Sequence, residues 1–498
     1  MPKRYIGYSE FHHDAALAII NKDGVVEFAS HAERYSKKKN DAMIPDSLWD
    51  LYNAKTDKLV FYEDPDNWKF KKEFLNQDDW INEIPATAQR GFPAFNLGSD
   101  DYNMHHVSHC AGAFFTRPWK STEDTVMVSI DGYGERQSAV IYDHNFKLLH
   151  EWEYPKSVGI VYTEFTKALG LKPMEDEYVV MGLSSYGTPD QELYSLINSW
   201  YSTLPAINPD HSVDAKDTFG ERARIKFRVL IKNYLRSGKI SEEDFAATCQ
   251  SFAQTKILKI MKTARKYGSK LVYSGGCAQN VVINSKLPEI FDEVHIAVSP
   301  TDAGSSLGTA AMTWNKETGG DRLIFSPYCG YNIDTDVNPK EVVDHLLEHR
   351  ICGLAHGKAE FGPRALGNRS LIADVRYDVK DTVNAIKRRQ KYRPFAPAIL
   401  EEYADQYFEG PMNEYMQYTS KALHDYSSVT HVDGTARVQV VKSDCESIFR
   451  KVIEEYYERT GVPMLLNTSL NIRGFPMVND IEDAKGFERK YNVKVFYE

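Results

Sequence analysis

Two histidines lie one helical turn apart in the segment MHHVSHCAGAFF at 104–115. If this segment is a helix, His105 and His109 project their imidazoles from the same face. Asp131 follows the apolar run TVMVSI and Asp302 follows HIAVSP, so both carboxylates are expected at strand ends. Two imidazoles with one or two carboxylates suit divalent iron, manganese or zinc, with open positions for a substrate oxygen. The alternative is a pair of surface histidines and two aspartates that serve as turn or cap residues.

Two glycine-containing segments also follow predicted strands. LVYSGGCAQN places Gly275 and Gly276 where a strand gives way to a helix, and SIDGYGE places Gly132 and Gly134 after another strand. Because glycine has no side chain, backbone N–H groups in such turns can approach a phosphate or a nucleoside. A simple tight turn is the alternative at both places.

The second half of the chain carries a concentrated group of cations. Between Lys358 and Arg393 there are ten Lys or Arg and four Asp or Glu, a local balance of +6. Five arginines of this half lie in loops punctuated by Gly and Pro: Arg364, Arg369, Arg388, Arg393 and Arg473. The run KRRQK alone is typical of a solvated face, but the arginines of FGPRALG and RPFAP have apolar neighbours, which are expected to hold them against the protein. Guanidinium groups bind phosphate bidentately, so a small phosphorylated ligand is expected.

An α/β arrangement is expected to position these groups. The opening predicts three short strands, at 4–10, 14–21 and 25–32. Further on, KLVFYE, TVMVSIDG, KLVYSGG and VHIAVSP are apolar runs separated by segments of helical length, notably 243–266. In such domains, ligands bind at the carboxyl ends of the strands. The segment 313–330 lacks apolar periodicity and contains a Gly pair and a Pro, so the main domain boundary is expected there.

Length and composition restrict the class of protein. The 498 residues predict two or three domains of roughly 150 to 250 residues each. Apolar runs such as AALAII are far shorter than the roughly 20 residues of a membrane span, and no secretory signal opens the chain, so membrane association is not expected. Six scattered cysteines without a CxxC pair favour reduced thiols in the cytoplasm. The net charge of -10 disfavours general binding of nucleic acid, so any anion site must be local.

Taken together, several motifs resemble those of the O-carbamoyltransferase family of the nodulation-protein and antibiotic-tailoring type. They are, in chain order, HDAALAII, AERYSKKKND, HHVSHCAGAFF, IDGYGE, EYVVMGLSSYG, GGCAQN, FGPRALGNRS, RPFAPAIL and NTSLNIRG. The resemblance implies a first domain at 1–325 like the tRNA threonylcarbamoyl transferases, on the duplicated α/β fold of actin and the sugar kinases. It implies a second, α+β domain at 326–498 like the YrdC proteins, which form carbamoyl-adenylate.

The resemblance also implies roles for individual residues. The metal set falls on His105, His109, Asp131 and Asp302, and iron is the expected metal. The catalytic residues fall on His13, which has His12 as its neighbour, and on Lys39. The nucleotide loop of the first domain falls on Gly132, Gly275, Gly276 and Asn280. The carbamoyl-phosphate and ATP positions of the second domain fall on Arg364, Arg369, Lys387, Arg388, Arg393, Asn467, Ser469 and Arg473. The chain departs from the family at Val179 and Asn40, where a lysine and a histidine are usual.

The activity implied by the resemblance is ATP-dependent O-carbamoyl transfer. The second domain would take carbamoyl phosphate, release phosphate, and couple the carbamate to ATP with magnesium, giving carbamoyl-adenylate and pyrophosphate. The first domain would transfer the carbamoyl group to an acceptor hydroxyl, from which His13 takes the proton. Carbamate needs this activation because its nitrogen donates into the carbonyl and hydroxide is a poor leaving group. The arginines would neutralise the phosphates and the charge developing at phosphorus.

The expected acceptor is small: a sugar, a cyclitol or a hydroxymethyl nucleotide. Hydroxymethylpyrimidine in DNA is an alternative that the net charge disfavours, since the first domain offers only Lys37 to Lys39 and the run ERARIKFR at 221–228 as scattered cations. A non-catalytic nucleotide-binding module is a further alternative, against which the intact His13 and metal positions argue. A metallopeptidase is disfavoured because the sequence has no HExxH motif. A homodimer is compatible with the sequence.

Overall fold

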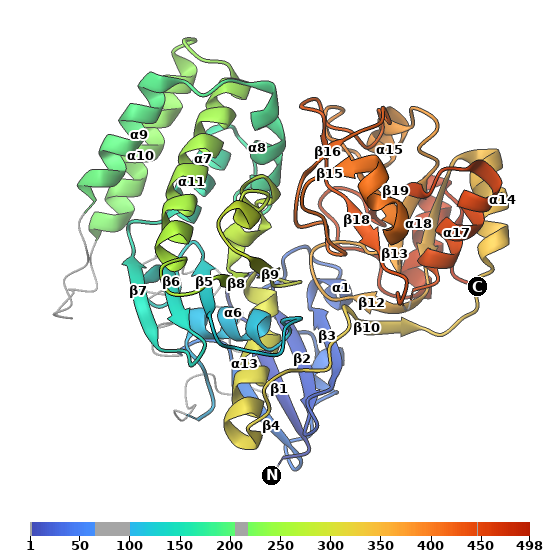
Figure 1. The fold of residues 1–498 in the computed structure, drawn as a ribbon, viewed down its shortest axis with the longest axis horizontal. Coiled ribbons are helices and arrows are strands. Elements are labelled where there is room, and N and C mark those ends of the chain that lie inside the picture. The colour runs from blue at the N-terminus through green and yellow to red at the C-terminus, as the bar shows by residue number, and fades with distance from the viewer. Residues whose placement is uncertain (1, 65–99, 205–217, 446) are drawn as a thin grey trace. The chain divides into compact units, whose positions relative to one another are not determined.

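The chain folds into two compact units. The computed structural model describes residues 2–64, 100–204, 218–445 and 447–498. The first unit takes in Met1–Val25, Tyr52–Ile283 and Leu287–Ile324, and the second takes in Val26–Leu51, Asn284–Lys286 and Phe325–Glu498. Both units mix helices and strands (Figure 1). A single boundary near residue 325 therefore does not separate the units, because residues 26–51 and 284–286 cluster with the C-terminal part of the chain.

Two sheets repeat one strand pattern. The first has the order β3-β2-β1-β4, built from β1 (Arg4–Ser9), β2 (Ala16–Asn21), β3 (Val26–His31) and β4 (Asp57–Phe61). The second has the order β7-β6-β5-β8-β9, built from β5 (Thr125–Ile130), β6 (Gln137–Asp143), β7 (Leu148–Glu153), β8 (Lys270–Ser274) and β9 (Glu293–Ile296). In both sheets the first strand in the chain pairs antiparallel with the second and parallel with the fourth. This repetition confirms the duplicated α/β fold expected for the first domain.

Five helices of the first unit gather beside the second sheet (Figure 1). They are α7 (Val158–Ala168), α8 (Glu177–Leu183), α9 (Gln191–Thr203), α10 (Thr218–Arg236) and α11 (Glu242–Ala264). Aromatic rings fill the space between them: Phe165 of α7 packs on Phe227 and Phe245, and Trp200 of α9 stacks on Phe227 at 3.9 Å between ring centroids. Burial of such rings supplies much of the free energy that holds a small helical layer together.

Two further helices, α6 (His105–Phe114) and α13 (Asp302–Thr318), approach each other unusually closely. A Cβ atom on Gly308 would lie 1.7 Å from the carbonyl oxygen of Ser108, and a Cβ on Gly112 would lie 3.1 Å from the carbonyl oxygen of Gly304. Glycine is therefore required at the contact, because its backbone can come within reach of the facing helix. The close approach places His109 of α6 opposite the first turn of α13.

The second unit is built on a six-stranded sheet of order β18-β14-β19-β13-β11-β20. Its strands are β11 (Ile351–Ala355), β13 (Arg369–Ala373), β14 (Ala396–Leu400), β18 (Gln439–Val441), β19 (Met464–Ser469) and β20 (Val495–Phe496). Alternate residues face opposite sides, as the pleat of a strand requires. Leu354 and Ile372 pack under α14 (Pro339–His349) and α17 (Phe449–Thr460), whereas Ala355 and Leu371 pack under α15 (Lys380–Ile386) and α18 (Ile481–Tyr491). Smaller sheets pair β10 (Tyr328–Ile333) with β12 (Gly357–Glu360), and β15 (Phe408–Glu409), β16 (Ser420–Ala422) and β17 (Thr435–Ala436).

A boundary between the units falls at Ile324 and Phe325, within the expected segment 313–330, but the first part of that segment is helical. Residues 313–318 form the last turns of α13, where Trp314 is buried, and the helix ends at Gly319 in a left-handed conformation (φ 72°). Charged residues on the exposed side of these turns hid the helical pattern. Among the helices that the structure describes, none is long and apolar enough to cross a membrane. All six cysteines are unpaired thiols.

Because α6 and α13 lie so close together, adding one methyl group at their contact should lower the stability of the protein substantially. Gly308→Ala should lower the free energy of unfolding by about 1–3 kcal/mol or more, because its Cβ has no room beside the Ser108 carbonyl. Gly486→Ala is the matched control: no atom lies within 4 Å of its Cβ position on α18, so this change should be neutral or stabilise the helix by up to about 1 kcal/mol. Urea or thermal unfolding measures both. Equal stabilities of the two variants would contradict the close packing.

Candidate functional site

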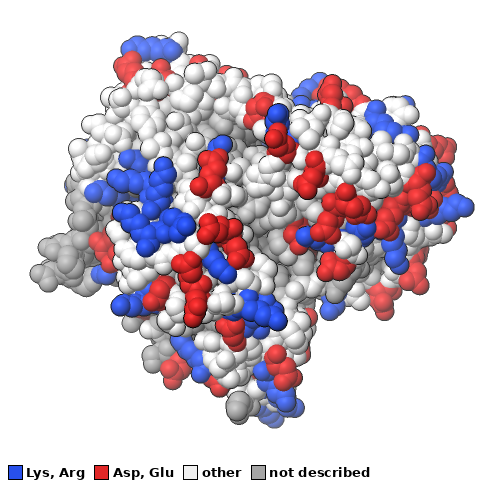
Figure 2. All heavy atoms as spheres, in the orientation of Figure 1, with Lys and Arg blue, Asp and Glu red and all other residues white. Residues whose placement is uncertain are grey.

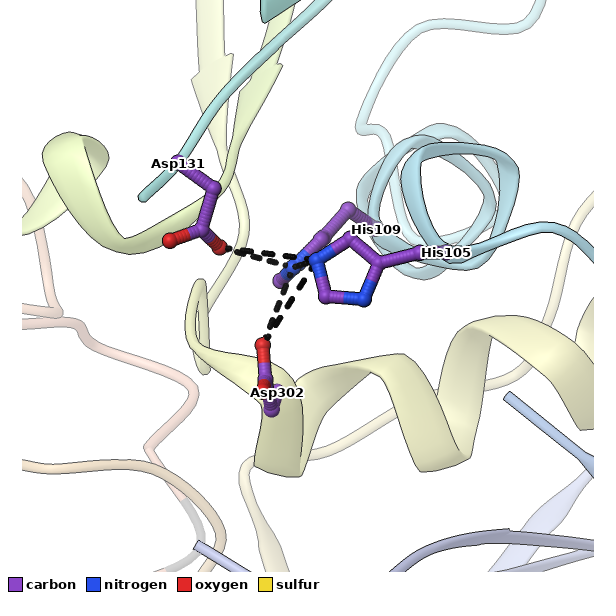
Figure 3. A group of neighbouring side chains, drawn as sticks. All are labelled: His105, His109, Asp131 and Asp302. Atoms are coloured by element: carbon purple, nitrogen blue, oxygen red, sulfur yellow. Dashed lines mark hydrogen bonds and ion pairs between the residues drawn. The ribbon is translucent and has the colours of Figure 1, made fainter. Parts of the chain in front are cut away.

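Four side chains of the first unit converge on one point (Figure 3). His105 and His109 project from α6, Asp131 follows β5, and Asp302 is the first residue of α13. Nε2 of His109 lies 3.1 Å from Nε2 of His105, 3.0 Å from Oδ2 of Asp131 and 3.3 Å from Oδ1 of Asp302. Nε2 of His105 is 3.8 Å from each of these oxygens. The structure thus brings together the four residues that the sequence singled out as metal ligands.

The three distances from Nε2 of His109 fit ligands of one divalent cation, whereas Nε2 of His105, at 3.8 Å from the two carboxylate oxygens, is slightly too far from them and would move toward a bound ion. Ligand atoms at about 2.0–2.2 Å from one ion are separated by about 2.8–3.6 Å at octahedral or tetrahedral angles. Burial lowers the pKa of His105, but hydrogen bonds with Asp131 and Glu63 outweigh burial and raise it to about 10. Burial raises the pKa of Asp131, yet its hydrogen bonds with His105 and His109 hold it well below the usual range. The two carboxylates are thus stabilised by positive charge on the imidazoles, and a divalent cation bound among the four side chains would supply such charge in its place.

Two buried glutamates hold His105 from behind. Glu135 accepts the backbone N–H of His105 at 2.7 Å and so caps the first turn of α6, where Met104 makes no side-chain cap. Oε2 of Glu63 lies 3.5 Å from Nδ1 of His105, the ring nitrogen that does not face the cluster. Sequence reasoning missed both glutamates. Their only signal was their place at the end of the predicted strand KLVFYE and in the glycine segment IDGYGE, five residues after the run TVMVSI ends.

The neighbouring His106 serves the fold. Its Nδ1 lies 2.8 Å from Oγ of Ser129 and its Nε2 lies 3.0 Å from the carbonyl oxygen of Gln137. Burial lowers the pKa of His106 to about 3, helped by the charge on His105. His106 is therefore a neutral residue that ties α6 to β5 and β6.

His13 lies beside the cluster, at Asp302. Its Nε2 is 3.8 Å from Oδ2 of Asp302, and its Nδ1 is 3.4 Å from Oδ2 of Asp14. Nδ1 of His12 is 3.9 Å from the same Asp302 oxygen, so both histidines reach it, but the contact with Asp14 distinguishes His13. Burial lowers the pKa of His13, whereas Asp302 and Asp14 raise it to about 9. Positive φ angles at Phe11 (81°) and Asp14 (53°) show that the turn around the two histidines is a constrained one.

The predicted glycine loops surround Asp131. The N–H of Gly132 donates to Oδ1 of Asp131 at 2.6 Å, and the N–H of Gly276 donates to Oδ2 at 3.2 Å. Gly275 has a φ of 90°, and a Cβ there would lie 2.3 Å from the carbonyl oxygen of Ile130, so the turn requires glycine. The loop and the potential metal ligands therefore form one site.

Asn280 is held by a residue that the sequence did not indicate. Its side-chain amide exchanges two hydrogen bonds with Gln250 of α11, at 2.9 and 3.1 Å. The hydroxyl of Tyr162 also donates to Gln250, at 2.9 Å. Lys39, by contrast, belongs to the second unit, where its Nζ lies 2.8 Å from both carboxylate oxygens of Glu33. A catalytic role for Lys39 stays a prediction.

A second group of functional candidates lies in the second unit, where arginines repel one another. Burial and then the charges of Arg364, Arg389 and Arg393 hold the pKa of Arg437 well below its usual range. Nε of Arg437 is buried and has no hydrogen-bond partner in the described part of the chain. Burial, Arg389 and Arg393 also lower the pKa of Lys387. Such a group is suited to a ligand with several negative charges. Sequence reasoning missed Arg389 and Arg437, and the only signal for Arg437 was an arginine between two short apolar runs in TARVQVV.

The end of β19 organises the surroundings of this group. Lys387 donates through Nζ to the carbonyl oxygen of Ser469 and, at 3.0 Å, to both oxygens of Asn471. Nδ2 of Asn467 donates to the carbonyl oxygen of Ala365 at 3.1 Å and so holds the FGPRALG loop. Lys387 therefore contacts Ser469, and Asn467 lies two residues before Ser469 on the same strand; a role of the three in ligand binding stays a prediction.

Arg369 differs from the other predicted ligands. It is fully buried, and all its side-chain nitrogen atoms donate to backbone carbonyl oxygens, including those of His356 at 2.7 Å and Tyr331 at 2.9 Å. Arg369 therefore braces loops. Arg388 and Arg473 are exposed, and Arg388 lies over the ring of Tyr491 at 5.8 Å.

Comparisons with known proteins show the family of the chain. The family model for the carbamoyltransferase N-terminus matches residues 94–311, and the model for the carbamoyltransferase C-terminus matches residues 343–497. Nodulation protein NolNO of Sinorhizobium fredii is 30% identical, over 95% of this chain and 76% of its own length. The 3'-hydroxymethylcephem-O-carbamoyltransferase of Amycolatopsis lactamdurans is 35% identical over 43% of this chain and 45% of its own length. Nodulation protein U of Sinorhizobium fredii is 31% identical over 48% of this chain and 47% of its own length. The chain therefore belongs to the O-carbamoyltransferase family of the nodulation-protein and antibiotic-tailoring type.

Proposed function

We propose that the protein uses carbamoyl phosphate and ATP to carbamoylate a hydroxyl group of a small acceptor. The observation that carries the proposal is the convergence of His13, four potential metal ligands and the glycine loops around the two oxygens of Asp131. The name of the cephem relative indicates a hydroxymethyl group on a small molecule as its acceptor. We propose an acceptor of the same chemical class here.

The second unit is proposed to activate the carbamoyl group, as a YrdC-like unit. Water would hydrolyse carbamoyl phosphate to carbamate and phosphate, and a carbamate oxygen would attack the α-phosphorus of ATP, yielding carbamoyl-adenylate and pyrophosphate. Magnesium would accompany ATP. The mutually repelling group of Arg364, Arg389, Arg393 and Arg437 supports this assignment, because preorganised cations stabilise phosphates and the charge that develops during their transfer.

The first unit is proposed to transfer the carbamoyl group. His13 would take the proton of the acceptor hydroxyl as its oxygen attacks the carbamoyl carbon and AMP leaves, while Asp14 orients the imidazole through Nδ1. The residues that would hold a divalent metal, for which we propose iron, are His105, His109, Asp131 and Asp302. When bound, the metal polarises an oxygen of the reactants as a Lewis acid. Asp302 is the strongest of the charges that raise the pKa of His13, so a cation held by Asp302 would lower that pKa toward the range in which His13 accepts a proton.

One observation favours a second class of acceptor, hydroxymethylpyrimidine in DNA. Figure 2 shows Lys and Arg side chains gathered over the helices α9 to α11, at the left of the view. Residues 222–240 contain seven Lys or Arg and no Asp or Glu. Arg224 and Arg228 bind the buried Glu164, but Arg222 and Lys226 are exposed. The run that looked like scattered cations in the sequence therefore offers exposed cations, which suit a phosphate backbone.

Metal binding should depend on the two imidazoles of α6. His105→Ala combined with His109→Ala should remove the metal, about one ion per chain in the unchanged protein, and Asp131→Asn should weaken binding by about 10-fold or more. Elemental analysis of gel-filtered protein measures the content. His106→Gln is the matched control, because His106 lies on the same helix and bonds to Ser129. Full occupancy in the double variant would defeat the assignment.

The two half-reactions should separate by mutation. Arg364→Ala, Arg393→Ala and Arg437→Ala should each lower carbamoyl-phosphate-dependent release of pyrophosphate by about 100-fold or more. His13→Ala should retain this release and lower product formation by about 100- to 10,000-fold. A coupled pyrophosphate assay and mass spectrometry of the product measure the two steps. Lys391→Ala, at an exposed position of the same run, should change neither. Equal loss of both steps in His13→Ala would show that the steps are wrongly assigned.

Presenting the same hydroxymethyl group in molecules of different size can decide between a small acceptor and DNA. A hydroxymethylated base should be offered as nucleoside, nucleotide and DNA strand, together with hydroxylated sugars, at low and moderate salt. We expect the small compounds to gain one carbamoyl group, at rates that neither salt nor Arg222→Glu with Lys226→Glu changes. Faster modification of the strand, suppressed by salt and by this charge reversal, would establish DNA as the acceptor.

A further inference from the structure

The segment AERYSKKKN at 32–40 has no part in the reaction as proposed so far, yet the structure places it firmly in the second unit. It contains the short helix α1 (Glu33–Ser36). The ring of His31, just before it, lies 5.5 Å from that of Phe361, and Nζ of Lys37 pairs with Asp483 and Asp480 at the start of α18. The segment therefore packs against the FGPRALGN loop, although it lies far from that loop in the sequence.

Arg34 is the residue of this segment that reaches the loop. Its side chain is buried, with 1% of its surface exposed, and Nη2 donates to the carbonyl oxygen of Gly362 at 3.1 Å. Burial lowers the pKa of Arg34, and Glu360 and Glu33 oppose this shift. Nε and Nη1 are also buried, without a hydrogen-bond partner among the residues that the structure describes. A guanidinium group buried at this cost needs a reason beyond simple packing.

The loop that Arg34 contacts is held closed at several points. Oε1 of Glu360 accepts three backbone N–H groups at 2.7–3.2 Å, from Leu366, Asn368 and Arg369. Positive φ angles at Gly362 (128°) and Gly367 (125°) frame the turn that presents Arg364. Glu360 thus fixes the end of the loop, whereas Arg34 fixes its entry, two residues before Arg364.

We propose that Arg34 positions Arg364 for carbamoyl phosphate, so that the segment AERYSKKKN serves the activating half-reaction. Arg34 acts through the carbonyl group of Gly362 and through the charge of Glu360, so it is a positioning residue. The inference rests on the proposed function, because it requires two separable half-reactions. It differs from the prediction that Lys39 is a catalytic residue, which would assign this segment to the transfer step in the first domain.

Kinetics of Arg34→Lys test the inference. Lysine keeps the positive charge but has no planar fork, so the KM for carbamoyl phosphate in pyrophosphate release should rise about 10-fold or more, and kcat should fall by less than that. The amount of carbamoylated product formed for each pyrophosphate released should stay that of the unchanged enzyme. Lys38→Ala is the matched control, because Lys38 belongs to the same segment and its side chain is 65% exposed. This variant should change neither quantity.

Other outcomes are equally decisive. Normal pyrophosphate release with less product for each pyrophosphate would place the segment in the transfer step and overturn the inference. In Arg34→Ala, guanidinium ions added at millimolar concentration should fill the cavity left by the side chain and restore pyrophosphate release, increasingly as their concentration rises. If Arg34 has only a structural role, the variant should show a lowered melting temperature and no such rescue. If the unchanged enzyme releases no pyrophosphate, the proposed function fails. In that case, calorimetry of carbamoyl-phosphate binding tests the role of Arg34 directly. Weaker binding by Arg34→Lys would support the inference, and equal affinities of the two proteins would overturn it.

Discussion

Both units hold like charges close together in the absence of substrate. Much of the structure serves to offset the repulsion between these charges. Carboxylate oxygens of Asp131 and Asp302 both lie within 3.3 Å of Nε2 of His109. In the second unit, burial and the positive charges of three arginines lower the pKa of Arg437. Holding like charges together in a folded chain costs free energy, which packing and hydrogen bonds elsewhere must supply. The same arrangement costs no reorganisation during a reaction, so the charges act on a transition state at full strength.

Backbone groups help to fix the surroundings of these charges. In the first unit, N–H groups of Gly132 and Gly276 bind the carboxylate of Asp131, and the glycine contact between α6 and α13 fixes the helices that carry the remaining ligands. In the second unit, carbonyl oxygens of the FGPRALGN loop accept hydrogen bonds from Arg34 and Asn467. Backbone contacts follow from the fold itself, so they position charged side chains more firmly than contacts between flexible side chains do.

Simple periodicities made part of the site predictable from the sequence. The spacing of His105 and His109 and the strand ends before Asp131 indicated a cluster, and the apolar runs indicated the strands that carry it. Glu135 was not predictable in this way, because it caps a helix that begins thirty residues earlier in the chain, and no spacing rule reports such a contact. Arg437 was missed because it stands alone in the sequence and joins the other arginines only in the folded unit.

A domain defined as a stretch of sequence differs here from the unit that carries a chemical step. Residues 26–51 belong to the N-terminal domain by position, but Arg34 donates to Gly362, and Lys37 pairs with Asp483. Cutting the chain at the sequence boundary near residue 325 would separate each of these pairs. The C-terminal piece would then contain the arginines proposed to bind phosphates, but it would lack the donor that fixes the entry of their loop. The geometry proposed to activate carbamoyl phosphate is therefore a property of the whole chain, because its second unit is assembled from both ends of the sequence.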